Sequence, residues 1–108
     1  MSKEDVKKIG EDAGIPIVHM AWPEGSAPPL PWATFYLSGQ SGVNADNVVY
    51  AKASTWVVEL YQRSSDEELE KKVEQSIVTR FGPYTKSEYW VDTESAIQTT
   101  YYFREIGD

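Results

Sequence analysis

The stretch STWVVELYQRSSDEELEKKVEQSIVTRFGP, residues 54–83, decides the fold because it joins a strong strand to an amphipathic helix. Residues 55–61 are rich in β-branched and aromatic side chains, which suit a pleated, half-buried surface. Period-two alternation places Trp56, Val58 and Leu60 on one face of this strand. The other face is chemically mixed, so we expect it to lie nearer solvent or a partner. That face carries Thr55, Val57, Glu59 and Tyr61.

The residues that follow predict a surface helix over 65–81. Ser65 is expected to be its N-cap, with Glu68 bonding back to the cap as in a capping box. Gly82 and Pro83 are expected to end the helix, since glycine favours the position after a helix and proline cannot continue it. An apolar stripe should face a sheet, and it consists of Leu69, Val73, Ile77 and Phe81.

The rest of the chain predicts a short helix over 2–12 and several more strands. Extended runs cover 15–22 (IPIVHMAW), 32–37 (WATFYL) and 48–61, the last being one bent strand or two. The runs 84–92 and 96–105 are predicted to form a closing hairpin. We therefore expect one domain, 1–108, with an α+β two-layer sandwich. Its sheet should be mostly antiparallel, with two helices in the order α-β-β-β(-β)-α-β-β.

Charge and composition argue against several functional classes. The chain of 108 residues has a formal net charge of −7, which disfavours nucleic-acid binding through a basic patch. Cysteine is absent, so neither a disulfide nor a thiolate metal site is possible. No run approaches the roughly 20 apolar residues of a membrane span, and no membrane association is expected.

Two connections are predicted to be loops. The first, PEGSAPPLP at 23–31, is stiffened by prolines that cannot donate backbone hydrogen bonds. The second, SGQSGVNADN at 38–47, consists mostly of small polar residues and glycine and is expected to be a mobile hairpin tip.

No catalytic or cofactor motif accompanies these elements. A phosphate-binding loop, a dinucleotide fingerprint and a calcium loop are all missing from the sequence. His19 is the one histidine and cannot assemble a zinc site by itself. The acidic residues of the final hairpin, with Glu59, leave open a distant alternative of acid–base catalysis. We therefore predict no enzyme activity, no metal and no cofactor.

The region from about Ile15 to Gln75 resembles small prophage proteins of Gram-positive bacteria that complete the phage tail. The similarity lies in the order and texture of the segments: IPIVHMAW running into PEGSAPPLP, the aromatic strand WATFYL, the loop SGVNADN, and VVELYQ before DEELEKKVE.

This resemblance implies a non-enzymatic assembly protein. Such a protein is recruited to the finished tail tube in the host cytoplasm and forms a ring, expected to be a hexamer, that joins the tail to the head connector. It would then remain in the virion at the head–tail interface. Recognition would fall to the two loops and to one strand residue, guessed here as Gly25, Pro28, Pro29, Gly39, Gln40, Gly42, Asn44, Asp46 and Tyr61.

A second interpretation stays open beside it. The chain could be a small ligand- or peptide-binding α+β module with its site on the sheet face that bears Trp90, Tyr101 and Phe103. That interpretation predicts a deep apolar cavity between helix and sheet.

Overall fold

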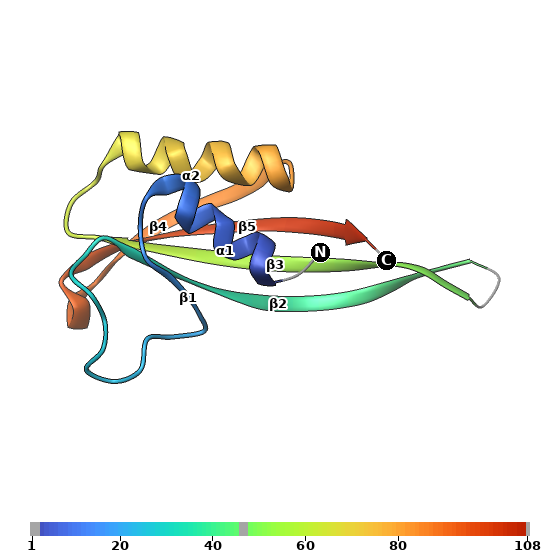
Figure 1. Ribbon diagram of the computed structural model, residues 1–108, viewed down its shortest axis with the longest axis horizontal. Coiled ribbons are helices and arrows are strands. Elements are labelled where there is room, and N and C mark those ends of the chain that lie inside the picture. The colour runs from blue at the N-terminus through green and yellow to red at the C-terminus, as the bar shows by residue number, and fades with distance from the viewer. Residues whose placement is uncertain (1–2, 46–47, 108) are drawn as a thin grey trace.

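The computed structural model describes residues 3–45 and 48–107, which form two α-helices and a five-stranded sheet (Figure 1). The strand order is β1-β2-β3-β5-β4, with β1 parallel to β2 and the other neighbours antiparallel. Both helices cover the same face of the sheet, which confirms the predicted α+β fold. The elements are α1 (Lys3–Ala13), β1 (Ile17–His19), β2 (Trp32–Ala45), β3 (Val48–Gln62), α2 (Glu67–Arg80), β4 (Tyr84–Val91), the short 3-10 helix η1 (Asp92–Glu94) and β5 (Ala96–Gly107).

The core lies between the helices and the sheet. The predicted inward face of the central strand is confirmed, because Trp56, Val58 and Leu60 are buried in one cluster with residues of both helices. β3 runs unbroken through residues 48–62, so the choice between one strand and two resolves as one. The predicted stripe of α2 packs on this face, where Leu69, Val73 and Ile77 are buried and Phe81 is partly buried.

The start of α2 differs from the prediction by one residue. Asp66, and not Ser65, is the N-cap, and its Oδ1 accepts the backbone N–H of Leu69 at 3.1 Å. Ser65 instead donates its hydroxyl to Glu70 Oε2 at 3.0 Å. The predicted capping box of Ser65 and Glu68 is therefore wrong. Serine and aspartate are both preferred N-cap residues, so the sequence alone did not distinguish Ser65 from Asp66. The helix ends at Arg80 with Phe81 as its C-cap, and Gly82 follows with a φ of +108°, as expected for a glycine that stops a helix.

We expect Asp66→Ala to lower the free energy of unfolding by about 1 kcal/mol, because one N-terminal amide loses its acceptor. Asp66→Asn keeps a side-chain acceptor at this position and is the matched control, which should lose only a few tenths of that amount. Urea denaturation followed by far-UV circular dichroism would measure both. Equal losses in the two variants would contradict the capping role of the side-chain oxygen.

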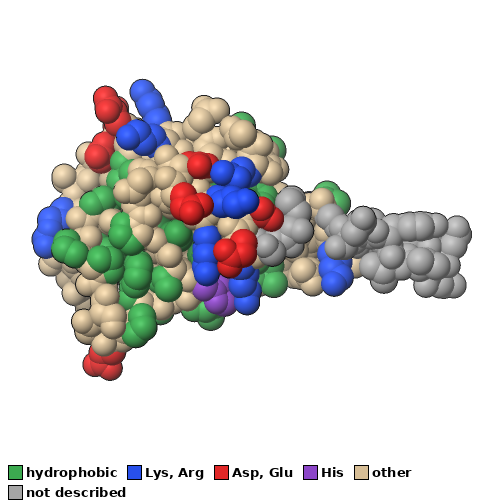
Figure 2. All heavy atoms as spheres, in the orientation of Figure 1, with side chains coloured by type: hydrophobic (Ala, Val, Ile, Leu, Met, Phe, Trp, Pro, Cys, Tyr) green, Lys and Arg blue, Asp and Glu red, His purple; other side chains and the backbone are tan. Residues whose placement is uncertain are grey.

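The N-terminal helix is held against α2. Val6 and Ile9 are buried in the core, and Asp12 pairs with Arg80 at 3.0 Å. Ser76 donates its hydroxyl to Asp12 at 2.7 Å. This hydrogen bond, together with Arg80, holds the pKa of Asp12 below its usual value. The exposed surface of α1 carries charges of both signs (Figure 2).

The first strand is shorter than predicted. The run 15–22 was expected to continue through Trp22, but β1 ends at His19 because Met20 turns the chain with a φ of +72°. Residues 20–31 then form a long connection that hangs from the face of the sheet opposite the helices (Figure 1). A long connection is needed here, since parallel neighbours such as β1 and β2 cannot be joined by a tight turn. The predicted loop over 23–31 is confirmed.

The second predicted loop is wrong over most of its length. Residues 38–45 belong to β2 and pair with β3, in a register that runs from Gly39 opposite Thr55 to Ala45 opposite Val48. The register shifts between Leu37 and Gly39, where Ser38 has no opposite residue, and a bulge beside a glycine is typical of a bending strand. Ladder bonding to β3 imposes strand geometry that the small polar residues do not favour by themselves.

Candidate interaction surfaces

The outer part of the β2–β3 hairpin, residues 39–45 and 48–54, projects beyond the body of the molecule, and we call it the arm (Figure 1). The molecule measures 50 × 29 × 23 Å, and the arm lies along the long dimension. β5 accompanies β3 only as far as Lys52, and β1 accompanies β2 only as far as Phe35. Within the described residues, the outer edge of β2 in the arm therefore has no neighbouring strand. Such an edge can add a strand from another chain.

The face of the sheet opposite the helices, which we call the open face, is rich in aromatic and polar side chains. Residues that pair across antiparallel strands share a face, so the strand register assigns its members. Successive rows across the sheet are Trp32-Tyr61-Gln98-Tyr89, Thr34-Glu59-Thr100-Ser87 and Tyr36-Val57-Tyr102-Thr85.

A hydrogen-bond network positions the carboxylate of Glu59 on this face. Thr34 donates its hydroxyl to Glu59 Oε1 at 3.2 Å, and Gln98 donates its amide to Glu59 Oε2 at 2.9 Å. Gln98 also accepts the hydroxyl of Tyr61 at 3.1 Å and donates to the Tyr89 hydroxyl oxygen at 2.7 Å. Thr34 and Gln98 are buried, so their positions are set by packing as well as by these bonds.

The tyrosines around Glu59 titrate in a negative environment. Burial raises the pKa of Tyr61 to about 12, and the charges of Glu59 and Glu94 add to this shift. Burial also raises the pKa of Tyr36, again with a contribution from Glu59. Both hydroxyls therefore stay neutral at physiological pH, and they serve as hydrogen-bonding groups.

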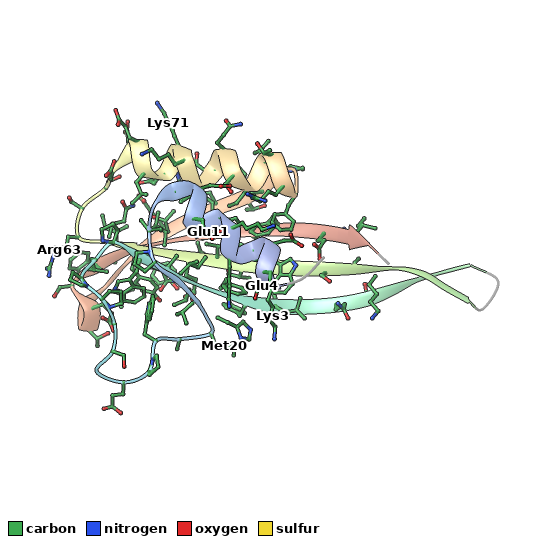
Figure 3. All side chains as sticks on the ribbon, in the orientation of Figure 1. Lys3, Glu4, Glu11, Met20, Arg63 and Lys71 are labelled. Carbon is green, nitrogen blue, oxygen red and sulfur yellow. The ribbon has the colours of Figure 1, made fainter. Side chains whose placement is uncertain are left out.

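A groove of about 560 Å³ lies between the start of segment 20–31 and the open face. Its volume falls within the range of small-ligand sites. Three aromatic rings stand together in it: the ring centroids of Trp22 and Trp32 lie 5.9 Å apart at 75°, and those of Trp32 and Tyr61 lie 4.6 Å apart at 35°. Figure 3 shows Met20, which also lines the groove, where this segment leaves the sheet. Hydrophobic side chains gather over the same part of the surface in Figure 2.

The charged residues of this groove are all acidic. Glu59 comes from β3, Glu24 from the connecting segment and Glu94 from η1. Among residues 3–45 and 48–107, no lysine or arginine forms an ion pair with any of the three. The groove therefore combines an aromatic wall with uncompensated negative charge.

The recognition residues predicted from the sequence lie in two places in the structure, around the groove and in the arm. Gly25 and Tyr61 both line the groove, although they lie far apart in the chain. Gly25 has a φ of +77° in a turn closed by the bond from the Ser26 N–H to the Pro23 carbonyl, a backbone geometry that favours glycine. Nearby, Pro28 is half-buried and Pro29 is exposed, and neither is among the groove residues.

The remaining guessed residues belong to the arm. Gly39, Gln40 and Gly42 are exposed there, and Gln40 donates its amide to the Ser54 hydroxyl at 2.9 Å. The backbone of Asn44 pairs opposite Val49. Asp46 lies outside the described residues.

The alternative interpretation places a ligand site on the sheet face that bears Trp90, Tyr101 and Phe103. Around Tyr101 and Phe103, this face is packed against α2. Tyr101 and Phe103 are 0% and 2% exposed, as members of the core, and Phe103 stacks on Phe81 with ring centroids 4.7 Å apart. Trp90 is exposed and donates its indole N–H to Asp92 at 2.6 Å. His19 packs on Phe35 with ring centroids 5.1 Å apart, as a partly buried structural residue would.

A second hollow, of about 670 Å³, lies along the two helices. Ser76 and Arg80 in its wall both bond to Asp12, so these polar groups are explained by the docking of α1 on α2. In the described part of the chain, no three metal-ligating side chains lie close enough together to hold a metal ion. No helix in the same part is long and apolar enough to cross a membrane.

Comparison with known proteins does not decide between these surfaces. No protein-family model matches the chain, and no curated protein sequence matches it. The groove residues Trp22, Trp32 and Glu24 were not selected from the sequence, whereas Glu59 and Glu94 were considered there only among the carboxylates of the distant acid–base alternative. Alternation did place Glu59 and Tyr61 on one face, but only the path of segment 20–31 brings Trp22 and Glu24 to them.

Proposed function

We propose that this protein is a virion assembly protein that completes a phage tail tube and joins it to the head connector. It acts without catalysis, by forming a ring through contacts between its own copies. The arm is the observation that carries this proposal. Beyond the paired Gly42 and Lys52 the arm is a two-stranded ribbon without β5 beside it, and such ribbons are marginally stable in isolation.

Ring formation would give the arm a partner. The outer edge of β2 is open from Tyr36 onward among the described residues, and a neighbouring subunit could extend the sheet there. The negative charge of the chain supports the same role, because a ring through which DNA must pass should not bind phosphate tightly. On this proposal, the arm mediates both the association of copies of the protein with one another and their recruitment to the tail tube.

The test shortens the arm without cutting the sheet of the body. Residues 43–51 are replaced by Asn-Gly, which closes the paired Gly42 and Lys52 with a two-residue hairpin turn. We expect the variant to fold, with an unchanged near-UV circular dichroism spectrum of the tryptophans, yet to lose head–tail joining when it replaces the protein in its phage. Electron microscopy should then show complete tails and filled heads that are not joined.

Lys71→Ala on the exposed side of α2 is the control and should join heads to tails normally. Normal joining by the short-arm variant would exclude the arm as the assembly surface. Failure of the full-length protein to bind the ends of purified tail tubes would contradict the function itself.

A further inference from the structure

The groove on the open face has the chemistry of a site for an organic cation. Aromatic faces attract a positive charge placed over them, most strongly when the cation is partly desolvated. Trp22 and Tyr61, which are partly exposed, supply such faces, and the buried ring of Trp32 packs against both of them. The nearby Glu59 and Glu94 supply negative charge. With every charged group in the groove acidic, a bound cation would relieve repulsion among the carboxylates.

The position of Glu59 favours a ligand that donates hydrogen bonds. Each of its oxygens accepts one bond, from Thr34 or from Gln98, and each carboxylate oxygen has a second lone pair. The burial of Thr34 and Gln98 keeps the carboxylate in place, so little ordering is needed on binding.

The combination of flat rings and carboxylates distinguishes between cations. A guanidinium group is planar, stacks on aromatic rings and offers paired donors to a carboxylate, whereas an ammonium group is compact and strongly hydrated. The volume of about 560 Å³ also exceeds one side chain and leaves space for neighbouring residues of a peptide. These properties select an arginine within a polypeptide.

We propose that the groove between the start of segment 20–31 and the open face binds an arginine side chain of a partner protein. The guanidinium lies against the rings of Trp22 and Tyr61, which pack on the buried Trp32, and donates hydrogen bonds to Glu59 and Glu94. This site lies on the sheet face and not on the arm, so the inference stands independently of tail joining.

The probe is the peptide acetyl-Gly-Gly-Arg-Gly-Gly-amide, titrated into the full-length protein labelled with nitrogen-15. The indole N–H signals report on four tryptophans in separate places. We expect those of Trp22 and Trp32 to shift on binding. The signals of Trp56, which is buried with Glu105, and of Trp90, which bonds to Asp92, should stay unchanged.

Two variants test the carboxylates. Glu59→Gln preserves the acceptor for Thr34 and removes the charge, and it should weaken peptide binding by roughly tenfold, as expected for one hydrogen bond to a charged group. Glu94→Gln changes an exposed side chain of η1, so it removes a second negative charge from the groove without altering the buried hydrogen-bond network around Glu59. Glu88→Gln removes an exposed carboxylate on the helix side of β4 and should leave the affinity unchanged.

Peptides with citrulline or lysine in place of arginine complete the design. Citrulline keeps the shape without the charge and should fail to shift either indole signal. Equal binding of the citrulline peptide would overturn the proposal, and equal binding of the lysine peptide would overturn the assignment to arginine. Unchanged affinity in both Glu59→Gln and Glu94→Gln would also overturn it, and thermal melting would show whether each variant is folded.

Discussion

Lys86→Met is expected to lower the free energy of unfolding by about 1–2 kcal/mol, because it leaves the carboxylates of Glu70 and Glu74 without their cation. The Lys86 side chain is 35% exposed, so solvent screens part of this interaction. Lys86 Nζ lies 2.8 Å from Glu70 Oε1 and 2.8 Å from Glu74 Oε2. The side chain of Glu70 is 8% exposed and that of Glu74 is 20% exposed. Without the ammonium group, two carboxylates would face each other beneath α2.

The surrounding hydrogen bonds make this cluster a clamp between α2 and the sheet. Gln62 at the end of β3 donates to Glu70 Oε2 at 2.9 Å, and Tyr101 of β5 donates its hydroxyl to Glu74 Oε2 at 2.8 Å. Lys86 itself comes from β4 and lies over the ring of Tyr101, 5.8 Å from its centroid. Three strands are thereby bound to one helix through side chains that require the carboxylates to be ionised.

The clamp sets the direction of the pH dependence. Burial alone would raise the pKa of Glu70 and Glu74, but the hydrogen bonds from Lys86 and its neighbours outweigh burial and hold both values below the usual range. Their contribution to stability is therefore complete above the unfolded-state pKa and is lost as the pH falls through the lower folded-state values. Burial would lower the pKa of Lys86, and its bonds to Glu70 and Glu74 raise it instead, so its contribution is lost only in strongly alkaline solution.

Urea unfolding of the wild type and of Lys86→Met at several pH values would measure these effects. Methionine keeps an unbranched apolar stem, so the comparison isolates the charge. Lys72→Met on the exposed surface of α2 is the matched control and should change stability little. If Lys86→Met were as stable as the wild type and lost stability in acid in the same way, the clamp would not contribute.

Gly10→Ala is expected to destabilise the protein by about 2 kcal/mol, although the same change in a helix is ordinarily favourable by roughly 0.5–1 kcal/mol. A Cβ at this position would overlap Ile17 Cγ2 and would lie 2.8 Å from the Ile17 Cβ. It would also lie 3.0 Å from the carbonyl oxygen of Ile15. The glycine thus permits α1 to approach β1 closely, and a methyl group would force the two apart.

Thermal unfolding would reveal this change, and a loss of about 2 kcal/mol corresponds to a fall in Tm of roughly 10 °C for a domain of this size. Glu11→Ala, at the neighbouring exposed position of α1, separates helix propensity from crowding and should be neutral or slightly stabilising. A rise in Tm for Gly10→Ala would show that α1 shifts freely against β1.

The periodic elements were predictable because their signals are local. The alternation of Trp56, Val58 and Leu60 and the stripe of Leu69, Val73 and Ile77 each lie within one element, and both faces are buried as predicted. The N-cap was misplaced because Ser65 and Asp66 are both good caps, and the choice depends on contacts with Gln62 and Glu70. A local pattern cannot distinguish these alternatives.

The arm and the groove were not predicted from the sequence, because both are formed by contacts between residues that lie far apart in the chain. Residues 38–45 have weak strand propensity, and their geometry follows from pairing with β3. Likewise, Trp22 meets Tyr61 and Glu94 only because segment 20–31 turns at Met20 and returns along the open face. The sequence by itself determined the helices, the strands other than the arm segment 38–45, and which faces are apolar, since periodicity is a local signal. The tertiary structure decided which polar faces meet, because contacts between distant segments depend on strand order and loop path.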